Sequence, residues 1–128
     1  MRAYINADIL IWHLRGDKRA LKFFQNLQEK KAEYELWIGA IQRAEIVFFM
    51  RPDEEESTTL FLSQFKTASL DQSCVDLGAS LYRKWHPSHG LDINDALLAA
   101  LVMQTGGKIY CLNKKHYPMP EIIVEKPF

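Results

Sequence analysis

The sequence contains no long apolar run and carries no net charge. No segment of its 128 residues reaches the roughly 18 apolar residues that a membrane-spanning helix needs, and no apolar segment follows a basic start as in a secretory signal. Lys and Arg together number 16, and so do Asp and Glu. Because these charges balance, the net charge argues neither for nor against a nucleic-acid partner, and any such site must depend on local charge. We expect a cytoplasmic protein that stays off the membrane.

Cysteine is scarce, and the histidines are scattered. Cys74 and Cys111 lie in apolar surroundings and form neither a CxxC motif nor a Cys/His pair, while the four histidines show no ligand spacing. These observations exclude a disulfide framework and a zinc site of the usual kind. We predict that both cysteines are small core residues of a protein in a reducing compartment.

Several catalytic motifs are absent as well. The sequence has no GxSxG and no HExxH, which excludes the common serine hydrolase and zinc protease signatures. TGGK at 105–108 lacks the spacing of a phosphate-binding loop and precedes a predicted strand, so we interpret its glycines as the end of a helix.

What the sequence does contain is the patterning of one α/β domain over residues 1–128. Strand-like and helix-like segments alternate, which is typical of a parallel sheet with helices on both faces. We predict strands at 3–5, 34–38, 108–112 and 122–124, and helices at 9–14, 39–50, 72–85 and 93–104. Two further helices begin after Asp17, with Ala20, Phe23, Phe24 and Leu27 at helical spacing, and at Pro52, with Phe61, Phe65 and Ala68 on one side. Pro87 should end the helix at 72–85. The predicted fold class is therefore a three-layer α/β/α domain with a central, mostly parallel sheet.

Four polar residues should gather at one edge of this sheet. Ligands of open parallel sheets bind outside the carboxyl ends of the strands. Asn6 ends the first strand and Asn113 follows the strand at 108–112, while Glu45 lies in the helix after the second strand and Asp95 near the start of an apolar helix. Two acids and two amides from four segments could thus meet there.

The two acids differ in how well a purely structural role explains them. Glu45 lies on an apolar helix, where a buried carboxylate is costly without a partner, although it could instead reach water, Arg43 or Arg51 at the rim. Asp92 in the segment DIND is explained as a helix cap. Asp95 is followed directly by ALLAALVM, which places its carboxylate at the border of the core. Together the two acids favour a functional site.

The other polar residues are open to simpler interpretations. Asn113 could be an ordinary turn residue, and Asp8 could cap the helix at 9–14. A cationic group near Asn113 could contact phosphates or form a solvated loop; it comprises Lys108, Lys114, Lys115 and His116.

Three segments together resemble the PIN-domain family, specifically the VapC-like toxin ribonucleases of toxin–antitoxin pairs: YINADILIWHLRG, AIQRAEIVFF and INDALLAALVMQTGGKIYCLNKKHY. The likeness extends over nearly the whole chain in order and spacing, although residues 53–87 match only in general character. The resemblance implies a single PIN-like domain that cleaves RNA with Mg²⁺ or Mn²⁺.

Carried over one at a time, the family's catalytic positions are Asn6, Glu45, Asp95 and Asn113, of which the first three would bind the metal. On the ribonuclease hypothesis, we expect the loop Lys114, Lys115 and His116 to contact the RNA substrate. The resemblance also implies a cognate antitoxin protein and a homodimer.

Asn6 departs from the pattern, because the family has Asp at this position. An amide offers an oxygen of similar shape without the negative charge, so metal binding and water activation should be impaired while the fold is kept. Asn6 could be a deliberate Asp→Asn change in a toxic nuclease, or a natural variant that is attenuated or recruits Asp8. Two other functions stay open: a non-catalytic PIN-like module that binds RNA or protein, and a phosphatase or phosphotransfer receiver that uses Asp8.

Overall fold

The computed structural model describes all residues from Met1 to Phe128 and contains one sheet of five parallel strands. The strand order is β3-β2-β1-β4-β5, and each strand is paired in parallel with its neighbours. The strands are β1 (Arg2–Ile5), β2 (Glu35–Gly39), β3 (Lys66–Ala68), β4 (Lys108–Tyr110) and β5 (Ile123–Glu125). The predicted α/β class and parallel sheet are confirmed.

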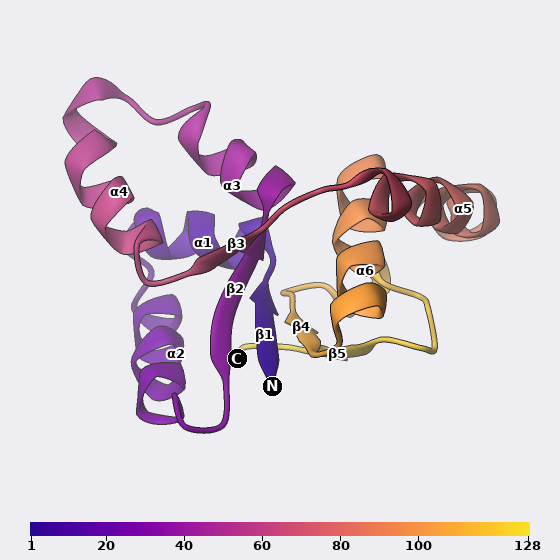
Figure 1. The fold of residues 1–128 in the computed structure, drawn as a ribbon. Coiled ribbons are helices and arrows are strands. Elements are labelled where there is room, and N and C mark those ends of the chain that lie inside the picture. The colour runs from indigo at the N-terminus through magenta and orange to yellow at the C-terminus, as the bar shows by residue number, and fades with distance from the viewer.

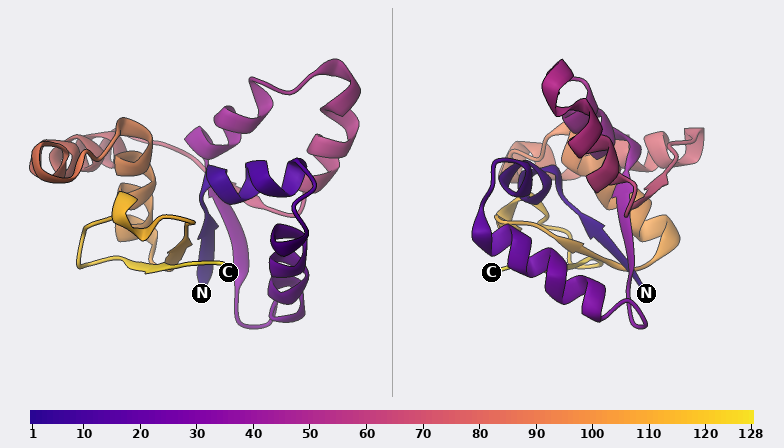
Figure 2. Two further views of the ribbon diagram at one scale, coloured as in Figure 1. Left: turned by 180° about the vertical axis from the view of Figure 1, so that it is seen from behind. Right: turned by 90° about the vertical axis from the view of Figure 1, so that its left-hand side faces the viewer.

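Helices cover both faces of the sheet, which gives three layers (Figures 1 and 2). They are α1 (Ala7–Leu14), α2 (Lys18–Glu29), α3 (Ala40–Val47), α4 (Glu55–Leu62), α5 (Gln72–His89) and α6 (Ile93–Thr105), with short 3₁₀ turns η1 (Pro52–Glu54) and η2 (Lys114–His116). One buried cluster joins α1, α2, α3 and α4 to the sheet, and it includes Ile9, Phe24, Ile46 and Phe61. The opposite cluster joins α5 and α6 to the sheet, and it includes Leu81, Leu98 and Ile109.

Aspartates begin the main helices, as their positions in the sequence suggest. Asp17 accepts hydrogen bonds from the backbone N–H groups of Arg19 (2.8 Å) and Ala20 (3.0 Å) at the start of α2. Asp92 accepts one from the N–H of Asp95 (2.7 Å) at the start of α6. Each bond satisfies a donor that the first helical turn would otherwise leave free. The predicted caps are confirmed, and they fix where α2 and α6 begin.

The region after Pro52 differs from the prediction. The helix ends at Leu62, so Phe65 and Ala68 do not continue its apolar side. Ala68 belongs instead to β3, a three-residue edge strand that the prediction missed. Its register pairs Trp37 with Lys66 and Gly39 with Ala68. A strand of three residues is too short to show the alternation of apolar and polar residues by which strands are predicted. Its backbone hydrogen bonds go to β2, which is distant in the sequence.

The helix α5 also differs, because it continues through Pro87 to His89. Proline removes one backbone bond, here the one to the carbonyl of Arg83. Pro87 and Arg83 are both exposed, so water can satisfy that carbonyl. The helix ends instead at Gly90, whose φ of 64° is left-handed.

The two cysteines lie in the interior, as predicted. Cys74 and Cys111 are free and buried. No helix has both the length and the apolar character needed to cross a membrane.

Candidate functional site

The carboxyl ends of β1 and β4 lie side by side and place Asn6 at their edge. Its backbone N–H donates to the carbonyl of Tyr110 (3.0 Å) at the end of β4. Asn6 precedes α1 but does not cap it with its side chain, so the amide is available for other partners. The side-chain Oδ1 accepts from the Tyr117 hydroxyl (2.7 Å), and Nδ2 donates to Cys111 Sγ (3.6 Å). The amide is only 7% exposed, and its orientation is set from both ends.

Asp95 lies in the first turn of α6, facing the same hydroxyl. Its Oδ1 is 3.2 Å from the Tyr117 hydroxyl, and its Oδ2 is 3.8 Å from His116 Nδ1. Burial raises the pKa of Asp95 to about 7, and the negative charges of Asp92 and Glu45 add to this, while His116 and the Tyr117 hydrogen bond oppose it. The Tyr117 hydroxyl has one hydrogen, which it can donate to Asn6 Oδ1 or to Asp95 Oδ1, so the two side chains share one donor.

Glu45 projects from α3 and is half-buried. Asn94 Nδ2 donates to Glu45 Oε1 (3.3 Å), which connects α3 to the residue beside Asp95. Burial and the charges of Asp92 and Asp8 raise the pKa of Glu45, and the bond from Asn94 opposes the rise. Neither Arg43 nor Arg51, the partners considered from the sequence, forms a salt bridge with Glu45, and Arg51 pairs with Glu54 instead.

Asn113 and the basic loop lie at the rim of this edge. Asn113 is exposed, and its Oδ1 accepts from the N–H of Lys115 (3.1 Å), so it caps η2. Lys114 and Lys115 are exposed, and His116 faces Asp95. Lys108 does not belong to this group. It begins β4 at the opposite edge of the sheet, is 5% exposed and pairs with Glu125 (3.2 Å).

Asp8 connects α1 to the chain after β4. Its Oδ1 accepts from the N–H of Ile9 (2.7 Å) and its Oδ2 from the N–H of Leu112 (3.2 Å). The suggested cap of a helix at 9–14 is wrong in its geometry, because α1 begins at Ala7. With both oxygens occupied by backbone donors, Asp8 adds negative charge to the edge and fixes its shape.

The structure therefore brings Asn6, Glu45 and Asp95 to one edge of the sheet, with Asn113 at its rim. No three His, Cys, Asp or Glu side chains are close enough to form a metal site by themselves. The oxygen donors that are present nevertheless suit a hard divalent cation, which is commonly held by one or two carboxylates together with water and substrate phosphate. The raised pKa values of Glu45 and Asp95 fit such a role, because a cation would favour the ionised form of both.

Asn94 and Tyr117 were missed in the sequence analysis. Asn94 stands next to Asp95 in the helix start, and its pairing with a residue 49 positions away has no local signature. Tyr117 follows η2, and no neighbouring residue in the sequence indicates that its hydroxyl reaches the functional edge. Only the packing of η2 against the end of β1 reveals it.

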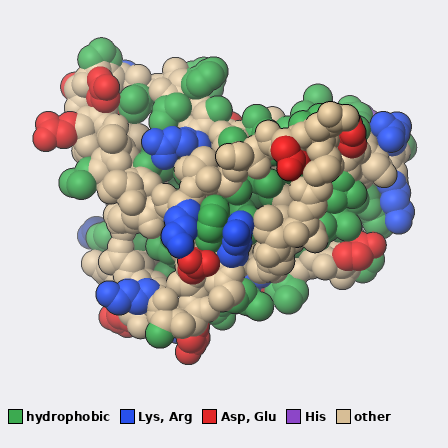
Figure 3. Space-filling model, in the orientation of Figure 1, with side chains coloured by type: hydrophobic (Ala, Val, Ile, Leu, Met, Phe, Trp, Pro, Cys, Tyr) green, Lys and Arg blue, Asp and Glu red, His purple; other side chains and the backbone are tan.

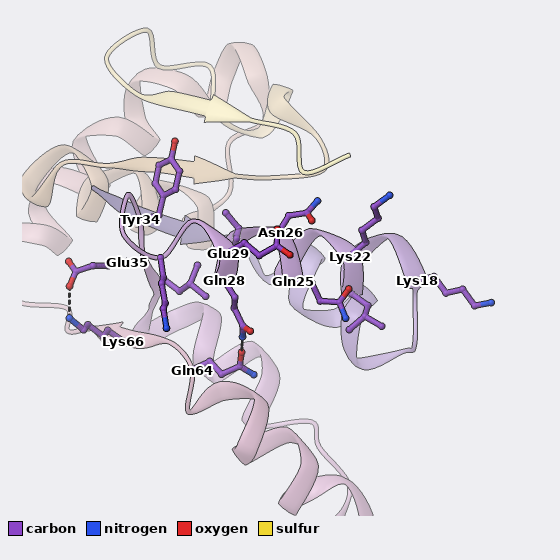
Figure 4. A pocket seen from close by; sticks show the side chains of 14 residues that line it. Lys18, Lys22, Gln25, Asn26, Gln28, Glu29, Tyr34, Glu35, Gln64 and Lys66 are labelled. Carbon is purple, nitrogen blue, oxygen red and sulfur yellow. Dashed lines mark hydrogen bonds and ion pairs between the residues drawn. The ribbon is translucent and has the colours of Figure 1, made fainter.

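The largest hollow of the surface lies elsewhere, along α2 and the amino ends of β2 and β3 (Figure 4). This groove of about 1040 Å³ is polar, and Figure 4 shows Lys66 paired with Glu35 and Gln28 bonded to Gln64 across it. None of the predicted site residues lines it. Size alone therefore does not identify the functional edge.

The class of this protein is an α/β domain whose acidic and amide side chains converge at the carboxyl edge of a parallel sheet. The sequence profile of the PIN domain matches residues 3–117, which spans all four predicted site positions. The chain belongs to the PIN domain family. Among curated protein sequences, none matches it.

Solved structures with the same fold come from toxin–antitoxin systems. A toxin–antitoxin complex from Klebsiella pneumoniae contains a chain that is 22% identical, with a TM-score of 0.76 and 98% of both chains covered. VapBC2 from Rickettsia felis, bound to a DNA fragment from its promoter, is 21% identical, with a TM-score of 0.78 and 98% of both chains covered. DNA-bound VapBC from Salmonella typhimurium is 12% identical, with a TM-score of 0.78, and the match covers 100% of this chain and 99% of that one. At these identities the likeness shows a shared fold.

Proposed function

We propose that this protein is a VapC-like toxin ribonuclease of the cytoplasm that hydrolyses RNA phosphodiesters with a bound Mg²⁺ or Mn²⁺, and that Asn6 impairs it. The observation that carries the proposal is the convergence of Glu45 and Asp95, since Asn94, the neighbour of Asp95, donates to Glu45 Oε1 (3.3 Å), and the charge of Glu45 adds a little to the raised pKa of Asp95. Two carboxylates held close in a partly buried site are unfavourable unless a cation joins them.

In this proposal each residue has a limited task. Glu45 and Asp95 hold the cation directly or through water, and Asn6 adds a neutral oxygen. Asn113 lies at the rim, where Lys114, Lys115 and His116 meet the RNA backbone. When bound, the metal would lower the pKa of an attacking water and neutralise charge on the phosphate. With Asn6 in place of an acid, the site has one negative charge fewer for this work.

The direct test restores the missing carboxylate. Asn6→Asp should cleave structured RNA in the presence of Mg²⁺ or Mn²⁺, and a chelator should abolish the cuts. Removing a ligand is expected to lower activity by about 10- to 100-fold or more, so the unmodified chain should be slower by at least this factor. Glu45→Gln placed in the Asn6→Asp chain serves as the matched control and should return it to inactivity. If Asn6→Asp stays inert on several RNAs, the ribonuclease proposal is wrong.

An antitoxin partner is part of the same proposal. Hydrophobic side chains lie exposed over the segment that joins α3 to α4 (Figure 3), where Phe48 and Phe49 are 79% and 81% exposed. Phe49 also lines a hollow of about 370 Å³ that reaches Glu45 and includes Ile11 and Leu14. Apolar surface of this kind beside a site commonly marks a protein interface. An antitoxin seated here would lie against the acidic edge.

A homodimer is supported by a second apolar hollow, of about 320 Å³, between α5 and α6. Val75 and Ile93 at its margin are 47% and 63% exposed. A second copy of the chain is the occupant that we propose.

The second candidate function is a non-catalytic PIN-like module that binds RNA or protein. Asn6 itself favours it, because the amide carries no negative charge and already bonds to Tyr117 and Cys111 without a cation. Titration with Mn²⁺ separates the two functions: a metal-dependent rise in melting temperature, absent from Asp95→Ala, supports the nuclease. The absence of any rise in both the unmodified chain and Asn6→Asp supports the module.

A further inference from the structure

Tyr117 is a buried polar group that the four predicted positions do not include. It is 4% exposed and belongs to the hydrophobic cluster under α6, together with Cys111, Met119 and Ile122. The hydroxyl at the tip of its ring is the part that reaches the functional edge. It contacts Asn6 Oδ1 at 2.7 Å and Asp95 Oδ1 at 3.2 Å.

The position of this hydroxyl is fixed from two sides. The backbone N–H of Tyr117 donates to the carbonyl of Lys114 (3.1 Å), which holds the residue at the end of η2. The ring is packed in the core, where side chains occupy a single well-defined rotamer. A hydroxyl held in this way can orient the side chains that it bonds.

The two partners are the side chains whose oxygens a metal would need. For Asn6, the bond to Tyr117 aims the carbonyl oxygen toward Asp95, and the bond from Nδ2 to Cys111 excludes the flipped amide. For Asp95, the bond selects which oxygen faces Asn6 and leaves Oδ2 toward His116. Each oxygen has a second lone pair, so a hydrogen bond does not prevent it from binding a cation.

We propose that Tyr117 is a positioning residue, which through one hydroxyl holds Asn6 and Asp95 in the arrangement that receives the divalent cation. The proposal rests on the proposed function and adds to it a residue outside the predicted ligand set. Hydrogen bonds from outside a metal's direct ligands commonly contribute 10- to 100-fold to its affinity. Tyr117→Phe removes this bond and keeps the ring that packs in the core.

The first experiment measures Mn²⁺ affinity by calorimetry in the Asn6→Asp chain, with and without Tyr117→Phe. The added change should weaken binding by about 10- to 100-fold. Tyr4→Phe in the same chain is the matched control. It also deletes a hydroxyl from a fully buried ring, where Tyr4 bonds to Thr105 (2.8 Å), but at the opposite edge. It should lower the melting temperature and leave Mn²⁺ affinity unchanged.

The outcomes separate this inference from the proposed function. If the Asn6→Asp chain binds no Mn²⁺, both fall. If it binds Mn²⁺ and Tyr117→Phe leaves the affinity unchanged, or lowers it no more than Tyr4→Phe does, the positioning role alone is overturned.

A second measurement needs no metal and uses the chain with Asn6 in place. Tyr117→Phe should shift the side-chain amide signal of Asn6 in a ¹⁵N correlation spectrum, because its carbonyl loses a donor at 2.7 Å. Tyr4→Phe should leave this signal where it is. An Asn6 signal that is the same in all three proteins would show that the hydroxyl does not hold the amide.

Discussion

Replacing Asp95 by Asn should stabilise the protein at alkaline pH. The carboxyl is 14% exposed, and its pKa in the folded chain is about 7, against an ordinary value of 3.8. Asn has nearly the same shape and cannot ionise. The substitution therefore removes the cost of holding a buried negative charge beside Glu45 and Asp92.

The sign and size follow from proton linkage. Between about pH 4 and pH 7 the folded chain holds a proton on Asp95 that the unfolded chain has lost, so stability falls as pH rises through this window. At about 1.4 kcal/mol per pH unit the full effect is near 4 kcal/mol. Partial contact with solvent reduces it, and we expect about 2 kcal/mol. Below pH 3.8, the ordinary pKa, Asp95 is protonated in the folded and the unfolded chain alike, and there the unmodified chain and Asp95→Asn should be equally stable.

Urea denaturation in chelator, at about pH 4.5 and pH 8.5, tests this prediction. Asp95→Asn should unfold with a free energy about 2 kcal/mol larger than that of the unmodified chain at the higher pH, and about 1 kcal/mol larger at the lower, where the unfolded chain has already lost most of its proton from Asp95. Asp76→Asn, on the exposed surface of α5, is the matched control and should change neither value. Equal stability of Asp95→Asn and the unmodified chain at both pH values would refute the claim that this carboxylate is held desolvated.

Two further predictions concern the partner surface and the sheet. Phe49 lines the hollow beside Glu45, and Phe49→Ser should abolish co-purification with an antitoxin encoded by an adjacent reading frame. Leu60→Ser, at a site that is 71% exposed and outside this hollow, should not. Loss of co-purification in both variants or in neither would contradict the proposed antitoxin surface. Gly107→Ala should cost more than about 2 kcal/mol in urea denaturation, because its φ is +104° and a Cβ would lie 2.4 Å from the Arg2 carbonyl oxygen. Gly16→Ala, with positive φ but open space, should cost about 1 kcal/mol, and equal losses would remove the steric explanation.

Much of the fold could be predicted because its signals are local. Alternating strand and helix patterns gave the α/β class, and aspartates before apolar runs located the starts of α2 and α6. The edge that holds Asn6, Glu45 and Asp95 also followed, since parallel strands all end on one side of their sheet. The catalytic roles of these residues stay predictions until the restored chain is tested.

Only the tertiary structure decided the rest. The strand β3 exists because β2 supplies its backbone partners, and α5 passes Pro87 at an exposed position, where water can satisfy the freed carbonyl. The bond between Tyr117 and Asn6 joins residues 111 positions apart, and that between Asn94 and Glu45 spans 49. Periodicity records which face of an element is buried, but it carries no information about which distant side chain will lie opposite. That choice is made when the layers pack.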